Sequence, residues 1–117
     1  MYNYANLTDN EFEELCKDIL EVSLGTKLHT YTKGRDQGID ICDNPYTKGI
    51  VVQVKHYLSQ NFSQCSAKIE AEIEKVNKLN LQKYYLCISA RLTPGNVKTI
   101  YSWFEEYMED TSSVITL

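Results

Sequence analysis

Long apolar runs are absent from this chain of 117 residues. No stretch approaches the roughly 18 apolar residues that a membrane-spanning helix requires, and the N-terminus lacks the basic and apolar segments of a signal peptide. The sequence therefore predicts a cytoplasmic protein that does not contact a membrane. Repeats, linkers and low-complexity tracts are also missing, so one domain is expected over residues 1–117.

Paired cysteines and the common nucleotide-binding motifs are missing too. The sequence contains no C-x-x-C pair, no P-loop, no G-x-G-x-x-G and no Ser-His-Asp order. Zinc binding by cysteines, nucleotide hydrolysis and acyl transfer therefore have no support. The four cysteines lie within or beside apolar patterns and are predicted to be buried thiols in a reducing compartment: Cys16, Cys42, Cys65 and Cys87.

Positive charge is in short supply, because 12 Lys and Arg residues face 16 Asp and Glu residues and the net charge is −4. This balance argues mildly against a module dedicated to binding nucleic acid. The basic residues nevertheless gather around one segment, which contains Lys33, Arg35, Lys48 and Lys55. Whole-chain charge therefore does not exclude a local basic patch.

Apolar residues recur at helical spacing in three segments. A T-x-x-E capping box at Thr8 begins the first helix, which ends near Gly25. A rotation of 100° per residue turns Glu13 toward the fold and Glu14 toward water. Ser63 is the candidate N-cap of the second helix, whose charged residues are expected mostly on the solvent side: Lys68, Glu70, Glu72, Glu74, Lys75 and Lys78.

The predicted order of elements is α-β-β-β-α-β-α-β, an α/β domain with a mixed sheet flanked by helices. The second helix is long enough to be a crossover, which makes the strands on either side of it parallel. The strands are expected at 27–32, 39–41, 50–57, 83–89 and 114–117, and Thr93 and Pro94 begin the third helix.

Polar residues interrupt two of these strands. Gln53 and Lys55 share one strand face, roughly 7 Å apart, and a hairpin would bring Asp40 beside them. Taken alone, this pattern is typical of a half-solvated sheet, and periodicity does not exclude that interpretation. His56 alternates away from Lys55 and is expected to be a packed or hydrogen-bonded histidine.

The polar residues and their flanks resemble the active-site hairpin of Mrr-type restriction-endonuclease-like nucleases, which carry a PD-(D/E)xK motif. The matching segments are GRDQGID at 34–40, QVK at 53–55 and FEEL at 12–15. The predicted order of elements is also similar to the core of that family. Each motif is weak alone, but together they cover nearly the whole chain in the expected order.

The resemblance implies a metal-dependent DNA endonuclease. Mg²⁺, with Mn²⁺ as a substitute, would be bound by Asp40, Gln53, Glu13 and the backbone carbonyl of Val54, and Lys55 would assist the attacking water and stabilise the phosphate. Asp36 is an additional candidate, although an Asp in a turn can simply bond backbone amides. Lys33, Arg35 and Lys48 are the candidate DNA contacts.

Several functions stay open on the sequence alone. The resemblance implies defence against foreign DNA, by a homo-oligomer or beside an adjoining sensor domain in a longer protein of which this is the N-terminal domain. Gln53, a neutral amide where the motif usually has an acid, keeps open a catalytically lapsed fold that binds DNA or protein. A Holliday-junction resolvase and an RNA nuclease are further alternatives.

Overall fold

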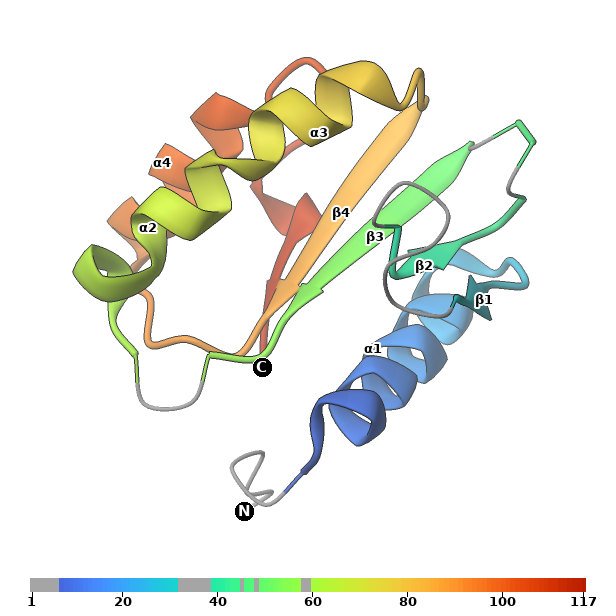
Figure 1. Cartoon of the computed structure of the whole chain (residues 1–117), viewed down its shortest axis with the longest axis horizontal. Coiled ribbons are helices and arrows are strands. Elements are labelled where there is room, and N and C mark those ends of the chain that lie inside the picture. The colour runs from blue at the N-terminus through green and yellow to red at the C-terminus, as the bar shows by residue number, and fades with distance from the viewer. Residues whose placement is uncertain (1–6, 32–38, 45, 48, 58–59) are drawn as a thin grey trace.

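One mixed sheet organises the described part of the chain, which comprises residues 7–31, 39–44, 46–47, 49–57 and 60–117 of the computed structural model (Figure 1). Within these residues the sheet has five strands in the order β1-β2-β3-β4-β5. The first three pair antiparallel, whereas β3, β4 and β5 pair parallel. The strands are β1 His29–Thr30, β2 Ile41–Cys42, β3 Ile50–Lys55, β4 Lys83–Ile88 and β5 Val114–Thr116.

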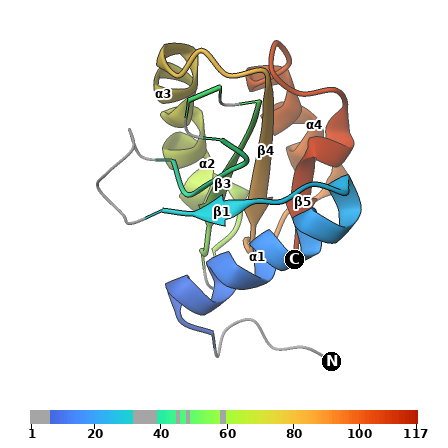
Figure 2. The ribbon, with the colours of Figure 1, turned by 90° about the vertical axis from the view of Figure 1, so that its right-hand side faces the viewer.

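Helices cover both faces of this sheet. They are α1 Asp9–Leu24, α2 Phe62–Glu70, α3 Glu72–Lys78 and α4 Pro94–Trp103. Figure 1 shows α1 on one face and α2, α3 and α4 on the other, and Figure 2 views the molecule from the α1 side. The predicted α+β fold, the order of its elements and the parallel β3–β4 crossover are confirmed, with the crossover helix divided into α2 and α3.

Neighbouring residues of β3 pack into two separate apolar clusters, one on each face of the sheet. Val52 packs in the cluster on the α1 face, together with Phe12 and Cys16, whereas Val51 packs in the cluster under α2, α3 and α4. This alternation is the one that a strand covered on both faces requires. All four cysteines are buried and free, as their apolar surroundings predicted.

The predicted caps of α1 and α4 are confirmed. Thr8 and Glu11 form a reciprocal capping box, and Gly25 ends α1 with a φ of 66°, a left-handed conformation that favours glycine. Thr93 caps α4 and is followed by Pro94 at the first helical position. Such caps are short-range features, and the cap at Thr8 fixes the turn that carries Asp9 and Glu13.

The second helix differs from its prediction in two ways. Its N-cap is Asn61, whose side chain accepts a hydrogen bond from Gln64, so Ser63 already lies inside the helix. Glu72 is only 5% exposed and does not lie on the solvent side. Buried positions recur at alternating spacings of four and three residues, a core stripe that includes Glu72: Cys65, Ile69, Glu72, Val76 and Leu79.

The β2–β3 pairing is short and ends before the end of β3. Ile41 pairs with Val52 in the antiparallel ladder, and the next pair in that register would join Asp40 to Gln53. The chain bends at Asp40 instead, and Ile39 and Ile41 pack in different apolar clusters. The strand predicted at 39–41 therefore begins only at Ile41, because Asp40 lies in a bend rather than in a strand.

Among the described residues, none of the helices combines the length and the apolar character needed to cross a bilayer.

Candidate active site

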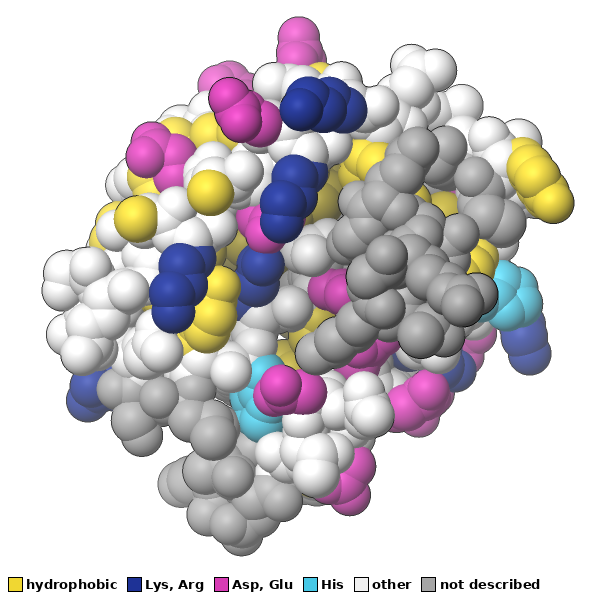
Figure 3. Space-filling view, viewed as in Figure 1, with side chains coloured by type: hydrophobic (Ala, Val, Ile, Leu, Met, Phe, Trp, Pro, Cys, Tyr) yellow, Lys and Arg dark blue, Asp and Glu magenta, His cyan; other side chains and the backbone are white. Residues whose placement is uncertain are grey.

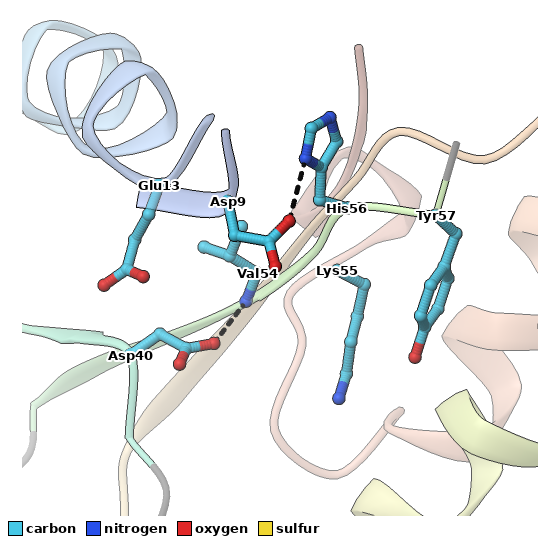
Figure 4. A pocket seen from close by; sticks show the side chains of 7 residues that line it. All are labelled: Asp9, Glu13, Asp40, Val54, Lys55, His56 and Tyr57. Carbon is cyan, nitrogen blue, oxygen red and sulfur yellow. Dashed lines mark hydrogen bonds and ion pairs between the residues drawn. The ribbon is translucent and has the colours of Figure 1, made fainter. Parts of the chain in front are cut away.

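A cavity of about 200 Å³ lies where β2 separates from β3. Its lining comes from the first turns of α1, from the bend before β2 and from the end of β3 and the residues after it. Figure 4 shows these side chains, which are those of Asp9, Glu13, Asp40, Val54, Lys55, His56 and Tyr57. Three of the predicted site residues, Glu13, Asp40 and Lys55, are thus brought together with the backbone of Val54.

Asp40 occupies the position where the sheet ladder stops. Its Oδ2 accepts a hydrogen bond of 2.9 Å from the backbone N–H of Val54. The carbonyls of Gly49 and Lys55 accept hydrogen bonds from Lys83 of β4 and from Ser89 directly after it. Backbone groups alternate in direction along a strand, so those of the even-numbered residues of β3 point toward β2. The Val54 carbonyl therefore faces the same gap as the Asp40 carboxylate.

Glu13 reaches the cavity from the opposite side, on α1. It is 6% exposed, whereas the side chain of Glu14 is 56% exposed, as the helical rotation predicted. In Figure 4 the Glu13 carboxylate points toward Asp40. Glu13 therefore shares the cavity with Asp40, and this position marks it as a functional candidate.

Lys55 enters the cavity from β3 and is held by a residue that the sequence-based assignment placed on the surface. Its Nζ lies 2.6 Å from Oε1 of Glu72, with side-chain exposures of 16% and 6%. Lys75 Nζ lies 3.5 Å from the same oxygen. The detectable signal was the spacing of Glu72 on the core stripe, where an acidic residue requires a buried cation as partner.

The pKa values of two tyrosines are raised in part by the negative charge of Glu72. Burial, followed by the Glu72 carboxylate, raises the pKa of Tyr57 to about 12. Burial and then Glu72 and Asp40 raise the pKa of Tyr84 well above its usual value. Both hydroxyls therefore stay protonated at neutral pH, and Tyr57 presents a hydrogen-bond donor at the cavity.

His56 is a packed histidine, as expected. Its ring stacks on Phe12 at a centroid distance of 4.4 Å, and Nδ1 lies 3.2 Å from Oδ1 of Asp9. The His56 side chain is 4% exposed. It therefore connects the N-terminal turn of α1 to the end of β3 and fixes one wall of the cavity.

One of the remaining predicted site residues, Gln53, is described by the structure but does not line this cavity. It is half-buried in β3, opposite Leu86 of β4. The other four lie outside the described residues: Lys33, Arg35, Asp36 and Lys48.

The donor set suits a hard cation that keeps most of its water. Over the described residues, no three side chains of His, Cys, Asp or Glu form a group that could hold a metal ion. Mg²⁺ differs from zinc in this respect, because it is commonly bound by one or two carboxylates, waters and substrate phosphates. The carboxylates of Glu13 and Asp40 and the backbone carbonyl of Val54 fit that requirement, since all are oxygen ligands.

Comparison with known proteins identifies the family. The restriction endonuclease profile of the Mrr catalytic type matches residues 4–98, and the chain belongs to this family. An uncharacterized protein of Sinorhizobium fredii, y4cD, is 32% identical over 99 residues, which are 85% of this chain and 16% of that protein. The chain thus spans about a sixth of the length of this relative. No solved structure gives a significant match.

Family membership supports nuclease activity in general. Restriction endonucleases generally depend on divalent metals. The family profile extends from α1 through the first residues of α4 and therefore includes every residue of the cavity.

Proposed function

We propose that this domain is a Mg²⁺-dependent endonuclease that hydrolyses phosphodiester bonds of DNA in defence against foreign DNA. One observation carries the proposal, namely that Glu13, Asp40 and Lys55 line a single cavity. Membership of the restriction endonuclease family supports the same chemistry. Mn²⁺ is expected to substitute for Mg²⁺, because both are bound by oxygen ligands.

The carboxylates and the cavity backbone would hold the cation. Asp40 would be the central ligand, with Glu13 and the Val54 carbonyl completing the protein contribution. Gln53 remains a candidate through its amide oxygen, since it directly precedes Val54 and shares a strand face with Lys55. When bound, a divalent cation supplies positive charge beside the scissile phosphate and makes water a better nucleophile at neutral pH.

Lys55 would act on the substrate as a fixed positive charge. Its ammonium has three donors, of which Glu72 accepts one, so the others are available to phosphate oxygens or to the attacking water. A preorganised cation stabilises the charge that accumulates on the phosphate during attack. Tyr57 offers a further donor at the same wall because its hydroxyl stays protonated.

A catalytically lapsed domain is the second candidate. It is favoured by Gln53, which is neutral and lies outside the cavity lining. The two candidates differ in a simple assay, in which supercoiled plasmid, branched DNA and RNA are incubated with the protein and Mg²⁺ or Mn²⁺. Nicking or linearisation of plasmid supports the endonuclease, preference for four-way junctions supports a resolvase, and binding without cleavage supports the lapsed fold.

The domain is further proposed to act as a homo-oligomer or beside an adjoining sensor domain. A net charge of −4 gives weak affinity for DNA. The match to a sixth of a longer relative supports a setting in which other domains contribute to binding.

The Mg²⁺ concentration that cleavage needs is expected to depend on the carboxylate of Glu13 but not on that of its neighbour Glu14. EDTA should abolish cleavage, and added Mg²⁺ should restore it. Glu13→Gln should raise the Mg²⁺ concentration for half-maximal cleavage by about 10- to 100-fold, the range for groups that tune a metal site. The matched variant Glu14→Gln should behave as wild type, because that side chain is exposed. Equal metal titrations for both variants would contradict a role for Glu13.

A further inference from the structure

Two lysines on the outer surface of α2 and α3 are tied to the wall of the cavity. Lys68 Nζ lies 5.3 Å from the centre of the Tyr57 ring, and Tyr57 lines the cavity. Lys75 Nζ contacts Glu72 Oε1 at 3.5 Å, the oxygen that also binds Lys55. Lys68 and Lys75 therefore lie on the side of α2 and α3 that faces Tyr57 and Lys55.

Charge is segregated around these helices. At 100° per residue, Lys68, Glu72 and Lys75 fall within about 60° of one another, whereas Glu70 and Glu74 fall on the opposite side. Glu72 is buried, so the exposed part of the stripe is basic, and the Lys75 side chain is 62% exposed. In Figure 3, Lys and Arg side chains lie over α2 and α3 toward the centre of the molecule.

Carboxylates line the cavity, and the basic stripe lies beyond Lys55, outside the cavity lining. Asp9 and Glu13 of α1 and Asp40 of the bend before β2 contribute the carboxylates, and Lys55 lies between them and the basic stripe. A carboxylate wall repels a phosphodiester strand unless a cation intervenes, whereas a lysine wall attracts it directly. The strand that places its scissile phosphate at Lys55 is therefore expected to continue over the lysine side.

We propose that Lys68 and Lys75 bind phosphates of duplex DNA beside the scissile phosphate. Seven residues of helix rise by about 10 Å, so the two lysines are far enough apart to contact different phosphates of a duplex. This proposal rests on the nuclease function proposed above and assigns its substrate contacts to α2 and α3, in addition to the loop lysines expected from the sequence.

Salt dependence of DNA binding tests the proposal without requiring cleavage. The affinity of the full chain for a 20-base-pair duplex is measured by fluorescence anisotropy in EDTA over a series of KCl concentrations. Each lost phosphate contact lowers the slope of log K against log salt by about 0.9, so Lys68→Gln with Lys75→Gln should lower it by about 1.8. Lys27→Gln with Lys98→Gln is the control, since it removes the same charge from other exposed positions.

Each outcome of this measurement decides the question. A reduced slope in the Lys68 and Lys75 double variant alone supports the proposal. An unchanged slope, an equal reduction in the control, or no binding by wild-type protein at low salt overturns it. Plasmid cleavage with Mg²⁺ is measured separately. If the protein binds DNA through these lysines but does not cleave it, the nuclease function is refuted. If wild type cleaves plasmid and the Lys68 and Lys75 double variant has an unchanged slope, only the proposed DNA contact of these two lysines is refuted. Circular dichroism of both double variants verifies that they are folded.

Discussion

Lys55→Met is expected to reduce the rate of DNA cleavage by about 10²- to 10³-fold, the usual effect of removing one preorganised group that stabilises transition-state charge. Methionine keeps an unbranched side chain of similar length but has no ammonium to place beside the phosphate. The reduction should appear in the single-turnover rate at saturating Mg²⁺, because the oxygen ligands at Glu13 and Asp40 are unchanged. DNA affinity should fall by no more than the loss of one phosphate contact, since the other proposed backbone contacts lie at Lys68 and Lys75.

The matched control for this variant is Lys98→Met. Lys98 is exposed on α4, which contributes no residue to the cavity lining. It should cleave plasmid at the wild-type rate. If wild type and Lys55→Met act identically on plasmid, branched DNA and RNA, Lys55 has no catalytic role and the enzyme proposal fails.

Glu72→Leu is expected to lower the free energy of unfolding by about 3 kcal/mol, because it leaves the largely buried Lys55 ammonium without its partner. Adding Lys55→Met should return stability to within about 1 kcal/mol of wild type, since apolar replacement of a whole buried ion pair is often neutral or stabilising. Urea denaturation followed by circular dichroism measures both values. The double variant should stay inactive while folded, which separates the catalytic loss from any loss of structure.

Glu74→Leu provides the control for Glu72→Leu, because the two residues are two positions apart on α3 and Glu74 is exposed. Its effect should stay within about 0.5 kcal/mol, as for most surface substitutions. A coupling energy near zero in the double-mutant cycle of Lys55 and Glu72 would show that the contact does not anchor the lysine.

Much of the fold could be predicted because its determinants are local. The capping boxes at Thr8 and Thr93 need only residues within one helical turn. The crossover helix between β3 and β4 requires the parallel pairing that the structure has. The inward position of Glu13 likewise follows from helical rotation alone.

The rest depends on contacts between distant segments. Nothing near Asp40 in the sequence indicates that β2 leaves β3 at this residue, or that a carboxylate takes the Val54 N–H in place of a backbone carbonyl. Glu72 was predicted to lie on the solvent side because most charged residues of its helix are exposed. Its partner, Lys55, is 17 residues away in the sequence, on β3. Both features arise where the pattern of one element is overruled by packing against another.

The central claim is that a hard cation binds between Glu13 of α1 and the end of β3, where the pairing with β2 stops. Crystals soaked in Mn²⁺ and examined by anomalous scattering test this claim. The account predicts one strong peak within coordination distance of Asp40, adjacent to Glu13 and the Val54 carbonyl. Asp40→Asn, which keeps an acceptor for the Val54 N–H, should remove the peak without altering the fold. No peak in this cavity, or a peak that persists in Asp40→Asn, would contradict it.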